Sequence, residues 1–152
     1  MERSKNMPKL TADDREMYAE FTSDFPYCMA CGIPDGTRDK TIDYPRHLER
    51  VHIIGGAGRV ADREDIWMAC KLCHDVSHGA RIVVAGKPLP KLRLEHVLWL
   101  KRVLDNDHWN RRYLATLAGR KTLPDIVPPP LWYQHQFARW HGIKHREWAR
   151  KR

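Results

Sequence analysis

The spacing of apolar residues predicts a chain of short helices and strands. Thr11 followed by two acids is a typical helix start, and the helix predicted for residues 12–22 would bury Met17, Tyr18 and Phe21. We expect this helix to pack against the rest of the fold through that apolar stripe.

Three further elements are predicted in the middle of the chain. The apolar runs 50–54 and 66–69 indicate two strands, and the glycines at 55–58 between them indicate a loop. A helix is predicted from residue 71 to about residue 80, where Gly79 is suited to end it. The order strand, loop, strand, helix is typical of an α+β unit.

The C-terminal part alternates helical periodicity with prolines. Two helices with apolar stripes are predicted at residues 91–104 and 108–118. A stiff proline-rich linker at 124–130 precedes a tail, residues 131–152, that mixes aromatic and basic side chains. The tail fits two interpretations equally: a helix docked by its aromatic stripe, or a basic aromatic arm that binds DNA.

Four cysteines form two Cys-x-x-Cys pairs, Cys28 with Cys31 and Cys70 with Cys73. Four thiolates in such pairs are the usual ligands of a tetrahedral structural zinc ion. The pairs lie farther apart in sequence than in a minimal zinc finger, so we expect an inserted segment between the two halves of the site.

Histidines in the same region predict a second, more open site. His74 and His78 are four residues apart, so on a helix they share one face and can bind one ion. His52 lies in the first apolar run. His47, five residues earlier, would fall on the opposite face of an extended strand, and we interpret it as a surface residue or phosphate contact.

The net charge of +8 favours a polyanionic partner, because neutralised phosphates release counterions. No apolar run approaches the ~20 residues of a membrane span, and the N-terminus lacks the apolar core of a signal peptide. We therefore expect a cytoplasmic protein with no membrane partner, in which reduced thiols bind metal in preference to forming disulfides.

These motifs resemble the HNH endonuclease family, in particular its phage and mobile-element branches. The resemblance covers residues 28–79. Val51-His52-Ile53 stands where the family has His-His-Ile or Asp-His-Ile, and Asp65 stands where the family has an Asn five residues before a cysteine. The last family motif, Cys-x-x-Cys-His-x-x-x-His, is matched in full from Cys70 onward.

The resemblance implies a ββα-metal core and metal-dependent hydrolysis of DNA phosphodiester bonds, by nicking or by double-strand cleavage. His52 would be the general base, and Asp65 would orient His52 or its loop. His74 would bind the catalytic ion, Mg²⁺ or another divalent ion such as Mn²⁺, Ni²⁺ or Zn²⁺, with His78 as a second ligand or a phosphate contact. The partners implied are DNA and the packaging or recombination proteins of a phage in its host cytoplasm.

Two departures from the family pattern leave an alternative open. Val51 stands where many members carry a metal ligand, and Asp65 lacks the hydrogen-bond donor of Asn. In another register His52 would be the ligand and Ile53 would stand at the base position, which would leave the site inactive. The alternative function is a catalytically inactive zinc-ribbon DNA-binding protein or a phage packaging accessory.

The predicted fold is thus α+β: a small zinc-bound ββα-metal core with flanking helices and a helical, basic C-terminal extension. We divide the chain into an N-terminal tail and packing helix (1–26), the zinc domain (27–86), a helical extension (87–123) and a proline-rich linker with a basic aromatic tail (124–152). The basic residues expected to contact DNA are Arg50, Arg59, Lys71, Arg139, Lys144 and Arg146.

Overall fold

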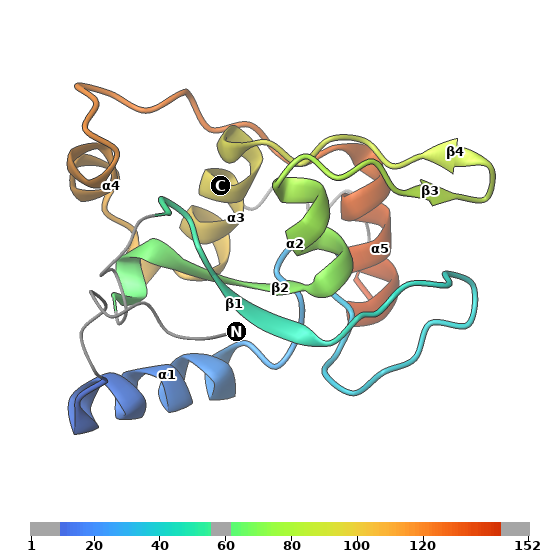
Figure 1. The fold of residues 1–152 in the computed structure, drawn as a ribbon, viewed down its shortest axis with the longest axis horizontal. Helices are drawn as coiled ribbons and strands as arrows, with labels where there is room; N and C mark the ends of the chain where they lie inside the picture. The colour runs from blue at the N-terminus through green and yellow to red at the C-terminus, as the bar shows by residue number, and fades with distance from the viewer. Residues whose placement is uncertain (1–9, 56–61, 144–152) are drawn as a thin grey trace.

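Five helices and two small antiparallel sheets make up the part of the chain that the computed structural model describes, residues 10–55 and 62–143. Arg59, Lys144 and Arg146 lie outside the described residues. The elements, with η for 3-10 turns, are α1 Ala12–Asp24, β1 Leu48–His52, η1 Arg63–Asp65, β2 Ile66–Cys70, α2 Lys71–Ser77, β3 Val83–Val84, β4 Lys87–Pro88, α3 Leu94–Leu104, η2 Asn106–His108, α4 Arg111–Leu117 and α5 Leu131–His141 (Figure 1).

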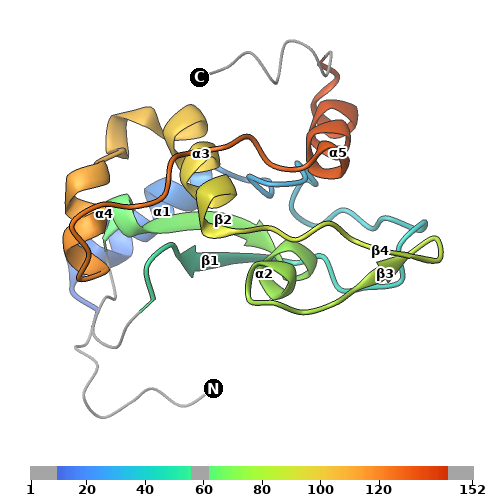
Figure 2. The same ribbon diagram turned by 90° about the horizontal axis from the view of Figure 1, so that it is seen from above.

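The centre of the fold is a β1–β2 hairpin with α2 packed against it. The strands are antiparallel, with Val51 opposite Trp67 and His52 opposite Ile66. α2 begins directly after β2 and contacts both strands. Every residue of β2 is buried, because β2 lies between β1 on one side and α3 on the other (Figure 2).

The central elements begin close to the predicted positions. β1 starts two residues earlier than the predicted strand, while β2 and α2 start where expected. α2 is shorter than predicted: it ends at Ser77, with His78 as its C-cap and Gly79 at φ +95°. The left-handed backbone at Gly79 is the conformation that glycine adopts without strain.

The helices that follow differ more from the prediction. α3 begins at Leu94 rather than at residue 91, and its N-cap residue Arg93 has extended backbone. The predicted helix at 108–118 forms only over α4, Arg111–Leu117, and its first predicted residue, His108, ends the 3-10 turn η2. Asn110 interrupts it, since its side chain accepts a hydrogen bond from the Tyr113 N–H over 3.0 Å and caps α4.

α5 matches the docked-helix interpretation of the tail as far as residue 143. Tyr133 and Phe137 are buried, and His141 Nε2 lies 3.0 Å from the Gly32 carbonyl oxygen. Gly32 has φ +82°, and a Cβ there would lie 2.8 Å from the Phe137 Cα. Only glycine fits this close approach, so the first Cys-x-x-Cys turn packs directly against α5.

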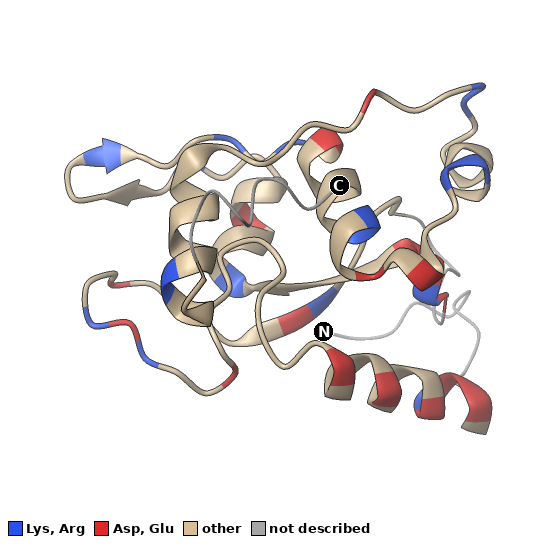
Figure 3. Cartoon of the chain, turned by 180° about the vertical axis from the view of Figure 1, so that it is seen from behind, with Lys and Arg blue, Asp and Glu red and all other residues tan. Residues whose placement is uncertain are grey.

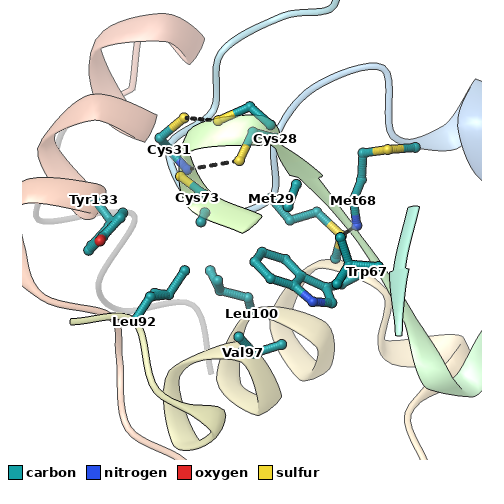
Figure 4. Close-up of a cluster of buried hydrophobic side chains, with 14 of the residues drawn as sticks. Cys28, Met29, Cys31, Trp67, Met68, Cys73, Leu92, Val97, Leu100 and Tyr133 are labelled. Atoms are coloured by element: carbon teal, nitrogen blue, oxygen red, sulfur yellow. Dashed lines mark hydrogen bonds between the residues drawn. The ribbon is translucent and has the colours of Figure 1, made fainter. Parts of the chain in front are cut away.

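One hydrophobic core joins α1, the hairpin, α3 and α5. Within it, Trp67 points toward Val97 and Leu100 of α3 (Figure 4). The core therefore crosses the predicted boundaries at residues 26, 86 and 123. None of the described helices combines the length and the apolarity that a bilayer span requires.

Candidate metal centre and histidine cleft

The four cysteines come together in one buried cluster. Their sulfur atoms all lie within 4.8 Å of one another, and Cys31 Sγ is 3.8 Å from Cys70 Sγ. In an ideal tetrahedron with Zn–S distances of ~2.3 Å, sulfurs lie about 3.8 Å apart. Four buried thiols at these separations fit a metal ion such as zinc.

Local hydrogen bonds hold the two halves of the cluster in place. The Cys31 N–H points at Cys28 Sγ over 3.5 Å, which is the usual turn of a zinc knuckle. The Met29 N–H donates to the Met68 carbonyl over 2.9 Å, tying this turn to β2. Cys70 ends β2 and Cys73 lies in α2, so the strand-to-helix junction supplies the second pair.

Arg46 approaches the cluster from the loop before β1. Its Nη2 donates to Cys31 Sγ over 3.0 Å, and its Nη1 pairs with Asp39 Oδ2 at 3.4 Å. Burial opposes this charge, but the Cys31 and Cys70 sulfurs raise the pKa of the guanidinium. A zinc ion with four thiolates carries net negative charge, which a buried cation at this distance offsets.

The thiols differ in their readiness to ionise. Burial raises the pKa of Cys28, whereas hydrogen bonds from Cys28 and Cys31 lower the pKa of Cys70. Binding an ion with all four sulfurs must therefore displace protons, and acid should favour release of the metal.

His52 is held by Asp65 at the end of the hairpin where the loop joins β1 to β2. The His52 Nδ1 lies 3.3 Å from Asp65 Oδ2, and Asp65 Oδ1 accepts the Ile54 N–H over 2.7 Å. The Asp65 side chain is fully buried, so it has little freedom to turn away. One carboxylate thus contacts both the imidazole and the start of the glycine-rich loop.

A buried ion-pair cluster supports the turn that carries Asp65. Lys101 Nζ donates to the Arg63 carbonyl and to Asp105 Oδ2, each over 2.6 Å. Asp105 also pairs with the Arg63 guanidinium at 3.2 Å. Burial lowers the pKa of Lys101, while hydrogen bonds from Arg63 and Lys101 outweigh burial and lower the pKa of Asp105. Because η1 runs from Arg63 to Asp65, the contacts of Lys101 and Asp105 with Arg63 connect this turn to α3 and its C-cap.

The other two histidines of the region lie at the C-terminal end of α2. The His74 and His78 rings are 4.8 Å apart between centroids, and His74 Nδ1 is 3.0 Å from Glu49 Oε1. Glu49 and Val51 lie two residues apart on β1 and face α2 together. Val51 is 5% exposed, so it lies in the core next to the Glu49–His74 pair.

A small cleft of ≈ 90 Å³ connects β1, α2 and the start of α3. It is lined by His52, Ile53, Trp67, Ser77, His78, Leu92, Arg93, Leu94 and Val97. His52 and His78 therefore face one space, although they are far apart in sequence. His74 is not among the lining residues and points to Glu49 instead.

The described basic residues expected to contact DNA each have an intramolecular partner. The Arg50 guanidinium lies 4.3 Å from the centre of the Tyr18 ring, and Lys71 pairs with Asp75 at 3.0 Å. Arg139 lies 3.8 Å from Asp39. His47 has a 62% exposed side chain, as expected for a surface residue.

Four functional candidates were not predicted from the sequence: Arg46, Glu49, Arg93 and Lys101. Only Glu49 had a usable signal, because a residue two positions before Val51 must share its strand face. Lys101 has one local partner, Asp105 four residues later, but its contact with the Arg63 carbonyl joins distant segments. The Arg46 contact with Cys31 and the cleft that Arg93 lines likewise join segments that no local pattern connects.

No family model matches the chain, and no match is found among curated proteins or among solved structures.

Proposed function

We propose that this protein is a metal-dependent DNA endonuclease of the HNH type. The observation that carries the proposal is the pairing of His52 with the buried Asp65 at the edge of a cleft that His78 also lines. An imidazole that is oriented by a carboxylate and open to a cleft is suited to take a proton from water. Further support comes from the order β1, β2, α2 and the adjoining cysteine cluster.

In this proposal each side chain has a separate task. His52 accepts the proton of the attacking water, and Asp65 holds the imidazole and the adjacent loop. His78, and His74 beside it, bind the divalent ion, since rings 4.8 Å apart are close enough to share one ion. The ion, when bound, would polarise the scissile phosphate and stabilise the leaving oxygen.

Glu49 adds a carboxylate that the resemblance did not include. It lies 3.0 Å from the His74 Nδ1, so it fixes that ring and leaves Nε2 as the nitrogen available to an ion. Imidazole ligands suit Ni²⁺ and Zn²⁺, whereas Mg²⁺ and Mn²⁺ prefer oxygen ligands, which water and the scissile phosphate would supply.

Nicking of supercoiled plasmid tests the proposal. Purified protein that carries its structural zinc is incubated with plasmid and with Mg²⁺, Mn²⁺, Ni²⁺ or Zn²⁺ in turn. We expect conversion to the nicked or linear form with at least one ion. Absence of cleavage with every ion, in protein shown to be folded, would contradict the proposal.

The alternative function is a DNA-binding protein or packaging accessory without catalysis. The buried Val51 favours it, because a metal ligand is usual at that position in the family that the motifs resemble. Salt-sensitive DNA binding without cleavage is the result that this alternative predicts.

A further inference from the structure

The segment between α2 and α3 carries a row of unpaired positive charge. Its four cations, all exposed, are Arg81, Lys87, Lys91 and Arg93. Among the described residues, none of the four side chains forms an ion pair with a carboxylate. This strap, residues 81–93, comprises the β3–β4 hairpin and the extended run that leads into α3.

The backbone of the strap aims its cations at solvent. Leu92 is 2% exposed and packs in the core, while Lys91 and Arg93 on either side are exposed. In extended backbone alternate residues face opposite ways, so burying Leu92 places both cations on the outer face. The exposure of Lys91 and Arg93 therefore follows from the burial of Leu92 between them.

Arg93 connects this row to the cleft. It lines the same space as His52 and His78, at the N-terminal end of α3. Its backbone N–H donates to His96 Nδ1 over 2.9 Å, so the α3 cap uses the main chain and leaves the guanidinium for other contacts. A guanidinium on the lining of the cleft can bind the phosphate oxygens of an entering strand.

The opposite end of the molecule has the opposite charge. α1 carries Asp13, Asp14, Glu16, Glu20 and Asp24. Figure 3 shows these acids along α1, and Figures 1 and 2 show α1 and the β3–β4 hairpin at opposite ends of the fold. A polyanion is repelled from the α1 end and attracted to the strap.

We propose that the strap 81–93 is the track for the DNA backbone, and that Arg93 binds the phosphate that enters the cleft beside His52 and His78. This inference rests on the proposed function and replaces Arg50 and Lys71, whose charges have partners within the fold, as the principal DNA contacts. The ligand class is a phosphodiester strand, which a bidentate guanidinium recognises without reading the bases.

The test compares Arg93→Ala and Arg93→Lys with Arg15→Ala, which removes an exposed arginine from the acidic helix α1. Binding to a mixed-sequence duplex is measured over a range of salt without added divalent ion, and plasmid nicking is measured separately. Arg93→Ala should lower the salt slope of log affinity by about 0.9 and slow nicking on the order of 10²-fold. Arg93→Lys should keep the slope but nick more slowly, because lysine keeps the charge and cannot form the two parallel hydrogen bonds of a guanidinium with a phosphate.

The possible results separate the strap assignment from the proposed nuclease activity. An unchanged slope and nicking rate in Arg93→Ala, or an equal effect of Arg15→Ala, would overturn the strap assignment. A lowered salt slope in Arg93→Ala, together with wild-type protein that never nicks, would refute the nuclease while supporting the track. Melting temperatures should not differ among the variants, since both guanidinium groups are exposed.

Discussion

Single side chains behind the two sites determine how rigid those sites are. Arg46 lies against the cysteine cluster, and Lys101 lies against the turn that carries Asp65. Neither has a place in the motifs, and each is buried next to a group of opposite charge. Removing such a charge leaves its partner buried without compensation, so both positions allow sharp tests.

Arg46→Leu should release zinc faster than the wild type. The guanidinium donates to Cys31 Sγ, and loss of such a supporting contact typically weakens metal binding ~10–100-fold. Zinc transfer to a chromophoric chelator measures the rate, and Arg38→Leu, an exposed change in the same loop, is the control. Equal release rates in the two variants would show that Arg46 does not support the cluster.

Lys101→Met should destabilise the fold by about 3–5 kcal/mol, because Asp105 would remain buried without its ammonium partner. Urea unfolding gives the free energy, and Arg102→Met, at a half-exposed neighbouring site, should cost much less. If Lys101→Met matches Arg102→Met, the cluster does not hold the Arg63–Asp65 turn in the way described.

At the scale of elements, the sequence predicted most accurately the element boundaries and the metal cluster that depend on short-range residue spacing. β2 and α2 begin where expected because Cys70 joins them, and the cysteine spacing itself predicted the cluster. Gly79 lies at the left-handed position just past the helix end, as its place in the sequence suggested, although α2 stops at Ser77, earlier than the predicted residue 80. The partners of Glu49 and Arg46, and the cleft that Arg93 lines, depend on tertiary contacts, which composition and periodicity do not encode.

The position of α5 also depends on tertiary contacts that the sequence pattern did not reveal. Its aromatic residues fitted a docked helix and a DNA arm equally, and the burial of Tyr133 and Phe137 and the contact with Gly32 favour the docked helix for the described part. Phe137→Ala should therefore cost about 3–5 kcal/mol of unfolding free energy, as is typical for a buried phenylalanine. Leu131→Ala, at a 60% exposed site of the same helix, is the matched control in thermal or urea unfolding. A small and equal loss in both variants would restore the arm interpretation.

At the scale of the whole molecule, charge is segregated although the chain is basic overall. The net charge of +8 suggested a polyanionic partner without saying where it binds. The acidic α1 and the cationic strap lie at opposite ends, with the histidine cleft next to the strap. In the function that we propose, this arrangement favours one direction of approach, in which a DNA strand follows the strap to His52.

The cysteine cluster and the histidine cleft share β2 and α2, so metal binding and site geometry should be coupled. Chelation of the zinc ion should unfold the protein, because the four sulfurs lie in its core and metal binding contributes folding energy. Loss of secondary structure by circular dichroism, restored by added zinc, is the expected result. A fold that is unchanged after complete zinc removal would show that the cluster is not structural.

The rate of plasmid nicking by His52→Ala tests the central claim most directly. Loss of a general base typically lowers the rate ~10²–10⁴-fold, while DNA affinity and melting temperature should stay near the wild-type values. His135→Ala, at an exposed site on α5, is the control and should nick at the wild-type rate. Nicking by His52→Ala at the wild-type rate would contradict the account.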